Sequence, residues 1–118
     1  MAPSTAIRRR LRRDERLARR TDFLAIQTRG RKLWSPHYLV FFRMRSQVPA
    51  RLGVTVSRKV GGAVVRNQVK RWIRETWRQR LDVKPSADVV VVARPGAQAL
   101  GFRATSEQLV GLIDRIPR

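Results

Sequence analysis

Cysteine is absent from this chain of 118 residues, which excludes disulfides and cysteine-based zinc sites and suits a reducing compartment. Acidic residues are scarce as well, at 8 against 27 lysines and arginines. No apolar run approaches the roughly 20 residues that a membrane-spanning helix needs. We therefore predict a cytoplasmic protein with no membrane partner, of a length that suits one compact domain.

The few titratable side chains form no catalytic constellation. His37 is the only histidine, and it follows Pro36 in a predicted turn without an evident orienting partner. The 8 acids include no Asp-x-Asp pair of the kind used in two-metal phosphodiester cleavage. The loop at residues 60–63, Val-Gly-Gly-Ala, lacks the Lys-Ser/Thr that completes an NTP-binding loop. We expect no catalytic residues and no metal ligands, so the protein alone should not cleave a substrate.

Positive charge is concentrated in the first two thirds of the chain. Residues 1–80 hold 22 lysines and arginines against 4 acids, whereas residues 81–118 hold 5 against 4. Such a local excess attracts polyanions, so nucleic acid is the leading partner, with an anionic membrane or an acidic protein as alternatives. Residues 1–15 are rich in arginine and poor in apolar side chains, which predicts a flexible basic tail ahead of a single domain at 16–118.

The most informative stretch, residues 66–78, separates into two faces when it is read as a helix at about 100° per residue. The apolar face consists of Val65, Val69, Trp72, Ile73 and Thr76. The cationic stripe consists of Arg66, Lys70, Arg71, Arg74 and Arg78. A helix that needed only solubility would mix acids into this stripe to form ion pairs, but Glu75 is the only carboxylate in it. The imbalance predicts an anionic partner.

Further polar residues extend this stripe into a candidate nucleic-acid surface. Arg58 and Lys59 precede the helix, and Asn67 lies on it. Guanidinium groups suit bidentate phosphate contacts, and an asparagine amide can bond a base edge or a ribose hydroxyl. The predicted RNA-binding set is Arg58, Lys59, Arg66, Asn67, Lys70, Arg71, Arg74 and Arg78.

The patterns elsewhere predict an α+β fold with helices on a small sheet. We expect a helix at 22–29 capped by Thr21 and ended by Gly30, antiparallel strands at 38–44 and 51–57, the long helix at 64–81, a central strand at 87–93 and a last helix capped at 105–107. Aromatic side chains on the first helix and strand are candidates for stacking on unpaired bases. Alternation puts Phe41 and Phe42 on opposite sides of the sheet, so only one of them can share a groove with Phe23.

Residues 51–75 read RLGVTVSRKVGGAVVRNQVKRWIRE. This stretch resembles the signature of the protein subunit of bacterial ribonuclease P: a strand of the type R-x-G-x-x-V-S-[KR]-[KR], a glycine turn, and R-N-x-x-K-R-x-x-R. The match extends to residues 20–23, Gly30, residues 38–40 and residues 88–94, and it covers about residues 16–116. The resemblance implies a two-layer α/β sandwich of order αβββαβα, with a small mixed sheet, a left-handed βαβ crossover and a further strand near residues 31–34.

The resemblance also implies a function. In that family a catalytic RNA removes the 5′ leader of precursor tRNA with Mg²⁺, and the protein positions the RNA and the leader. Contacts to the catalytic RNA would come from Arg58, Lys59, Arg66, Asn67, Lys70, Arg71 and Arg74, and Phe23 and Phe41 would line the leader cleft. Gln27 stands where family members often have a second aromatic residue, so contacts with the leader there would be either weaker or made by hydrogen bonds instead of stacking.

Three alternatives stay open at this stage. A structural RNA-binding protein of ribosomal type would share the charge and size. A DNA-binding module would need a compact helix-turn-helix, whereas predicted strands flank this helix on both sides. A stand-alone ribonuclease would cleave RNA when purified free of RNA.

Overall fold

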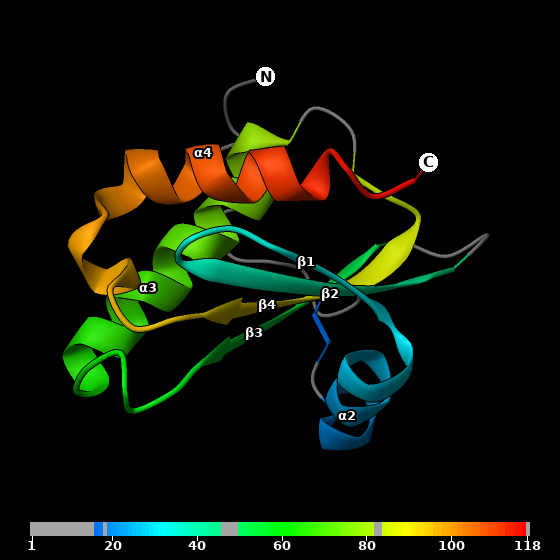
Figure 1. Cartoon of the computed structure of the whole chain (residues 1–118), viewed down its shortest axis with the longest axis horizontal. Helices are drawn as coiled ribbons and strands as arrows, with labels where there is room; N and C mark the ends of the chain where they lie inside the picture. The colour runs from blue at the N-terminus through cyan, green and yellow to red at the C-terminus, as the bar shows by residue number, and fades with distance from the viewer. Residues whose placement is uncertain (1–15, 18, 46–49, 82–83, 118) are drawn as a thin grey trace, which may run out of the picture.

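The fold is a four-stranded sheet with helices on both faces (Figure 1). The structure, a computed structural model, describes residues 16–17, 19–45, 50–81 and 84–117. The predicted tail at residues 1–15 lies outside the described residues. The elements are α2 (Arg20–Arg29), β1 (Arg31–Trp34), β2 (Tyr38–Met44), β3 (Arg51–Val56), α3 (Ala63–Glu75), β4 (Ala87–Ala93) and α4 (Gly101–Ile113). The expected order αβββαβα is confirmed, including the strand at 31–34 that only the resemblance implied.

The sheet is mixed, with the strand order β1-β2-β4-β3. β2 is antiparallel to both β1 and β4, whereas β3 is parallel to β4. β2 and β3 therefore run in opposite directions, as predicted, but they do not pair, because β4 lies between them. β4 takes the central place because its run of four valines is apolar on both faces, and such a strand is buried best with neighbours on either side.

Two hydrophobic clusters lie on opposite faces of the sheet. The main core lies between the sheet and the layer of α3 and α4, and it includes Val40, Val91, Ile73 and Leu109, each at most 1% exposed. α2 packs on the other face, where Ile26 forms a smaller cluster with Val90 and Leu17. The connection from β3 through α3 to β4 joins parallel neighbours. Its left hand, implied by the resemblance, stays a prediction.

The ends of α2 differ in how well the sequence predicted them. The helix begins at Arg20 with Arg19 as its N-cap, so the prediction of Thr21 as the capping residue was wrong. Gly30 ends the helix as expected, and its N–H donates to the carbonyl of Ile26 at 2.8 Å. A Cβ atom at Gly30 would lie 2.7 Å from the carbonyl oxygen of Phe42. The close approach of α2 to β2 therefore requires glycine here.

The last helix starts earlier than its cap-like residues suggested. α4 begins at Gly101, and Thr105 and Ser106 are buried inside it rather than capping it. The Thr105 hydroxyl lies 3.0 Å from the Tyr38 hydroxyl, and the Ser106 hydroxyl lies 2.7 Å from that of Thr76. These side chains bond across the core to other elements, a use of threonine and serine that local sequence does not distinguish from capping.

The predicted long helix at 64–81 is divided in the structure. Regular α-helix ends at Glu75, and a π-helical segment continues over Thr76–Arg80. Thr76 and Trp77 are both buried in this segment, at 0% and 1% exposure. The wider turn thus seats two consecutive side chains in the core just before the chain leaves for β4.

Candidate nucleic-acid interface

α3 carries an apolar face and a cationic face, as its periodicity predicted. Val69 and Ile73 are buried against the sheet and α4, and Trp72 packs on the edge of the same core. Val65 departs from the prediction, because it is 37% exposed. It stands in the first turn of α3, where its side chain faces Gly61 rather than the core.

The cationic stripe lies outside this core, with its members at different depths. Arg58, Lys59, Asn67 and Arg71 are exposed. Arg66, Lys70, Arg74 and Arg78 are half-buried. Half-burial of an arginine or lysine commonly packs the alkyl stem on the protein and leaves the charged end toward solvent, although Nε of Arg66 is itself buried. The structure thus brings all eight predicted residues to α3 and the segments that flank it.

Acids do not neutralise this stripe. Among the described residues, one ion pair involves it, between Nε of Arg71 and Oε1 of Glu75 at 3.6 Å. That pair is exposed on the arginine side, where ion pairs contribute about 1 kcal/mol or less to stability. Nε of Arg66 is buried and has no hydrogen-bond partner within the described part of the chain. The stripe therefore keeps its charge available for an anionic ligand.

Arg16 adds a cation that sequence reasoning did not assign to the site. A parallel bridge pairs Arg16 with Leu52 on the outer edge of β3, and the N–H of Leu17 donates to the carbonyl of Leu52 at 2.9 Å. Burial lowers the pKa of Arg74, and the nearby charge of Arg16 lowers it further. Two like charges held this close repel in the free protein, and an anion bound between them would relieve the repulsion. No periodic signal marked Arg16, because the contact is tertiary.

The aromatic pair predicted for the other face is brought together. Phe41 lies on the α2 side of the sheet, where it and Phe23 pack against the same small cluster, and Phe42 lies in the main core. The ring of Phe23 covers Gly53, since a Cβ atom there would lie 2.7 Å from two ring carbons. Gln27 is half-buried one turn further along α2. Contact of these three residues with a leader stays a prediction.

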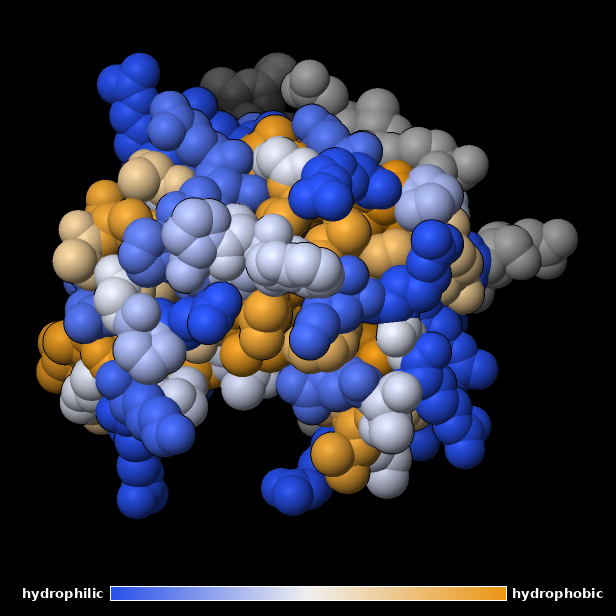
Figure 2. All heavy atoms as spheres, in the orientation of Figure 1, coloured by the Kyte–Doolittle hydropathy of each residue, from blue (hydrophilic) through white to orange (hydrophobic). Residues whose placement is uncertain are grey.

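α2 leaves part of this sheet face uncovered. The strand register places Trp34 opposite Leu39, Leu39 opposite Val92, and Val92 opposite Thr55. These four residues, which we call the open row, point to the same face as Phe41 because side chains alternate along each strand. None of the four is buried, and Trp34 is 62% exposed. Figure 2 shows the surface hollowed on this side, between α2 and the start of α3.

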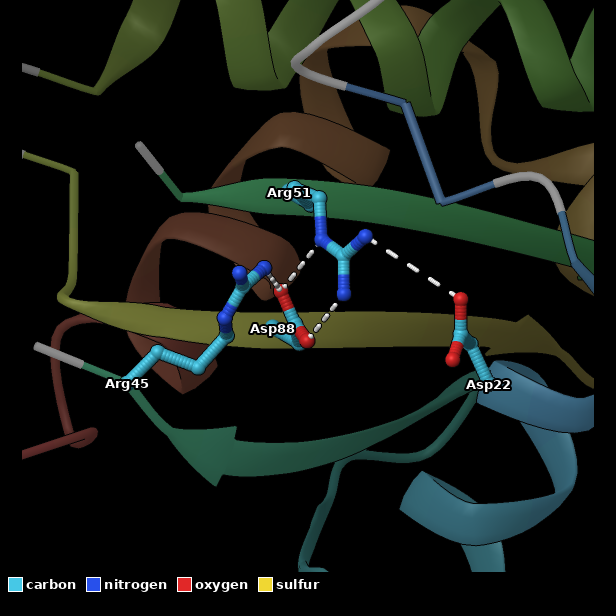
Figure 3. A network of polar contacts seen from close by, with 4 residues as sticks. All are labelled: Asp22, Arg45, Arg51 and Asp88. Atoms are coloured by element: carbon cyan, nitrogen blue, oxygen red, sulfur yellow. Dashed lines mark hydrogen bonds and ion pairs between the residues drawn. The ribbon is translucent and has the colours of Figure 1, made fainter. Parts of the chain in front are cut away.

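A different set of arginines is fully paired at the opposite end of the same sheet face (Figure 3). Oδ1 of Asp88 accepts from Arg45 Nη1 at 2.8 Å and from Arg51 Nε at 2.9 Å, and Oδ2 accepts from Arg51 Nη2 at 2.8 Å. Nη1 of Arg51 also lies 4.0 Å from Oδ2 of Asp22 on α2. We call these four residues the arginine brace, because they tie β2, β3 and β4 to α2.

The brace shifts the ionisation of its members. Burial raises the pKa of Asp88, but the hydrogen bonds from Arg51 and Arg45 outweigh it, so the net shift is downward. The hydrogen bond to Asp88 raises the pKa of Arg51. A cavity of about 300 Å³ adjoins the brace and is lined by Arg43 and Met44 as well. Asp88 is committed to two guanidinium groups, so it is unsuited to bind a metal ion.

Beyond these arginines, the described residues bear on three other possibilities: a metal site, a membrane-spanning helix and a general base. In the described ranges, no three His, Asp or Glu residues gather as metal ligands would. No described helix is both long and apolar enough to cross a membrane. His37 is engaged by Gln108, whose Nε2 lies 3.1 Å from Nδ1 of the ring and whose Oε1 accepts from the His37 backbone at 3.2 Å. The fold and its surface define a class: a small α/β protein that presents a basic helix to a polyanion.

Known proteins of this class match the chain along most of its length. The family profile of ribonuclease P matches residues 11–117. The ribonuclease P protein component of Geobacter sp. (strain M21) is 41% identical over 102 residues, which cover 86% of this chain and 88% of that protein. The same component of Thermotoga maritima is 38% identical over 109 residues, which cover 88% and 93%.

Solved structures agree with the sequence comparison. The RNase P protein from Thermotoga maritima, in complex with 1-(4-fluorophenyl)-2-thiourea, has a TM-score of 0.80 at 37% identity and covers 86% of this chain and 100% of its own. The Staphylococcus aureus RNase P protein has a TM-score of 0.78 at 28% identity and covers 85% and 93%. The chain belongs to the ribonuclease P protein component family. It is thus part of an endoribonuclease holoenzyme of tRNA processing, with an RNA partner.

Proposed function

We propose that this protein binds the catalytic RNA of ribonuclease P and the 5′ leader of precursor tRNA, and so assists RNA-catalysed removal of the leader in the cytoplasm. The observation that carries the proposal is the uncompensated cationic stripe of α3 in a chain of this family. Among the described residues, Arg71 is the only member of the stripe with a carboxylate within ion-pair distance. A phosphate backbone would supply the missing negative charge.

In this proposal the RNA carries out the chemistry and the protein positions it. Mg²⁺ bound by the RNA and the substrate would activate the attacking water. Among the described residues, no three His, Asp or Glu gather as magnesium ligands would, and Asp88 is held by Arg45 and Arg51. Cations on α3 would reduce the repulsion between RNA and substrate phosphates and so favour metal binding nearby.

The stand-alone ribonuclease fits the structure less well. A nuclease of that kind needs a general base that is free to exchange protons with the substrate. His37, the one histidine, is bonded to Gln108 in the turn between β1 and β2. Asp88 is committed to the brace. These engagements support the prediction, made from the sequence, that the purified protein is inactive on its own.

The leader would bind on the α2 face of the sheet. Phe23 and Phe41 pack against the same small cluster there, and both rings are half-buried beside the open row. Gln27 would add a hydrogen bond from its amide to a base edge. A single strand of RNA can bind such a surface by stacking its bases on aromatic rings while its phosphates meet nearby cations.

Reconstitution tests the function directly. The full chain is mixed with bacterial ribonuclease P RNA and precursor tRNA at a magnesium concentration too low for the RNA alone. We expect cleavage at the 5′ end of the mature tRNA to be restored, and no cleavage without the RNA. Absence of rescue would favour the structural RNA-binding alternative, and cleavage by the protein alone would favour the stand-alone ribonuclease.

A variant separates the two proposed surfaces. Phe23→Ala should weaken binding of precursor tRNA by the holoenzyme while leaving mature tRNA binding unchanged, because mature tRNA has no leader. Arg66→Ala should instead impair assembly with the catalytic RNA. Equal losses of precursor and mature tRNA binding for Phe23→Ala would contradict the placement of the leader.

A further inference from the structure

Trp34 exposes an unusually large apolar surface for a residue in a sheet. It is 62% exposed at the end of the edge strand β1, whereas Trp77 is buried in the core. Tryptophan is highly buried on average. The exposed ring of Trp34 lies in the open row with Leu39 and Val92, and an uncovered apolar patch of this kind indicates a binding surface. The sequence analysis assigned this residue no role in binding.

The register puts Trp34 beside the proposed leader site. Trp34 pairs with Leu39 across the β1–β2 hairpin, and Phe41 pairs with Lys32 two residues away. Phe41 is therefore a diagonal neighbour of Trp34 on the same face, at a Cα separation of about 7–8 Å. α2 supplies the ring of Phe23 to this face, and β1 supplies the ring of Trp34 at the β1 end of the open row.

The backbone that carries Trp34 is held in place by the turn that follows it. The N–H of Ser35 donates to the carbonyl of Tyr38 at 2.9 Å. The hydroxyl of Ser35 donates to Oε1 of Gln108 at 2.7 Å, and the N–H of His37 donates to the same oxygen at 3.2 Å. These bonds anchor the hairpin to α4. A ring on an anchored strand loses little conformational freedom when it binds, which favours stacking.

The charge around Trp34 selects the kind of ligand. Nζ of Lys32 lies 5.9 Å from the centre of the Trp34 ring, within the range of a cation–π contact. No carboxylate lies within ion-pair distance of Lys32 among the residues that the structure describes. A flat apolar ring beside an unpaired ammonium group suits a ligand with an aromatic base and a phosphate, and it suits an acidic or purely apolar protein surface less well.

We propose that Trp34 stacks on an unpaired base of the precursor-tRNA leader and that Lys32 contacts the adjoining phosphate. This extends the leader site from Phe23 and Phe41 to Trp34, at the end of the open row on the edge strand β1. The inference rests on the proposed function, because it names a residue that determines how far along the leader the protein makes contact.

The test uses the reconstituted holoenzyme and a set of precursor tRNAs, each with one abasic nucleotide at a different leader position. The variants are Trp34→Ala, Trp34→Gln and Trp34→Phe, with Leu24→Ala as the matched control, because Leu24 is an exposed apolar residue of α2 at 50%. Affinities for each precursor and for mature tRNA are measured by equilibrium binding. Leader cleavage is followed in parallel, so that loss of the whole function is seen separately.

Trp34→Ala and Trp34→Gln should each weaken precursor binding by about 5- to 100-fold, the range of base–aromatic stacking, and leave mature tRNA unchanged. Trp34→Phe should retain most of the affinity, and Leu24→Ala all of it. One abasic position should cost affinity with the wild type but nothing further with Trp34→Ala, which identifies the stacked base.

Wild-type affinity of Trp34→Ala and Trp34→Gln for every precursor would overturn the inference while leaving the proposed function intact. A loss that is equal for precursor and mature tRNA would overturn it too. So would a change in self-association of Trp34→Ala in sedimentation, since it would assign the exposed ring to an interface between copies of the chain. If the wild-type holoenzyme itself fails to cleave, the proposed function fails first.

Discussion

Two groups of arginines in this protein have opposite surroundings. In the brace, Arg45 and Arg51 converge on one buried carboxylate, and the hydrogen bonds that Arg51 donates to Asp88 raise the pKa of Arg51. On α3, burial and the charge of Arg16 lower the pKa of Arg74, and among the described residues no carboxylate lies within ion-pair distance of Arg74. Arginine side chains thus hold strands together in the brace, whereas on α3 they remain available to bind a polyanion. The difference lies in the placement of a single aspartate.

Salt should separate the two regions most strongly. If the stripe neutralises roughly 6 to 10 phosphates, affinity for the RNA should fall about a thousandfold or more between roughly 50 and 200 mM salt. The free energy of unfolding should change by about 1 kcal/mol or less over the same range, because Asp88 is buried and salt screens its ion pairs only weakly. Fluorescence anisotropy and urea unfolding measure the two quantities. A flat salt response of RNA binding would contradict the assignment of the stripe.

Removing the aspartate should convert the brace into an unpaired cluster. Asp88→Ala leaves two guanidinium groups without their acceptor and should lower the free energy of unfolding by about 2–3 kcal/mol. The loss of stability should be smaller than for a fully buried ion pair, because the side chains of Arg45 and Arg51 are 29% and 28% exposed. Urea denaturation measures the change.

Glu107→Ala is the matched control for that variant. Glu107 pairs with Arg103 on the surface of α4 at 3.8 Å, with both side chains largely exposed. Its removal should cost about 0.5 kcal/mol or less. Similar losses for the two variants would show that burial of Asp88 is not what makes the brace stabilising.

Acid should weaken the brace in a defined pH range. The pKa of Asp88 in the folded protein is below the ordinary value of 3.8, so the ionised carboxylate stabilises the fold above that pH. The stabilisation is lost as the pH falls below 3.8 and passes through the folded-state pKa. Asp88→Asn should therefore be less stable than the wild type at neutral pH, and the difference should shrink as the pH falls. Urea unfolding at several pH values measures this, and a constant difference would be the contrary result.

Removing a cation from the stripe should have the smallest effect on stability. Arg74→Gln relieves repulsion from Arg16, so the free energy of unfolding should change by about 0.5 kcal/mol or less. Binding of the catalytic RNA should weaken a few-fold, and the salt dependence should fall by roughly one phosphate contact. Arg103→Gln, on α4, should leave both RNA quantities unchanged. An effect of Arg103→Gln equal to that of Arg74→Gln would mean that net charge, rather than the stripe, governs binding.

Local patterns in the sequence predicted what depends on neighbours along the chain. The period of α3 identified Val69 and Ile73 as its buried face, and four valines identified β4 as the central strand. Alternation correctly separated Phe41 from Phe42. The sequence signature within residues 51–75 indicated the family, which the profile match over residues 11–117 confirmed.

The errors concern residues whose partners lie far away in the sequence. Thr105 and Ser106 have the composition of a helix cap but bond to Tyr38 and Thr76 across the core. β1 escaped pattern reading because three of its four residues are exposed, which leaves an edge strand without alternation. Trp34 was missed for the same reason.

By itself, the sequence determined the basic character of the protein, the two faces of α3 and the family, because these reside in composition, in periodicities of two to four residues and in the signature of residues 51–75. Only the tertiary structure decided that β4 separates β2 from β3, that Asp88 meets Arg45 and Arg51, and that Arg16 lies near Arg74. These contacts depend on which distant segments become neighbours in the fold. The free energy that decides this comes from packing of the whole core rather than from any local stretch.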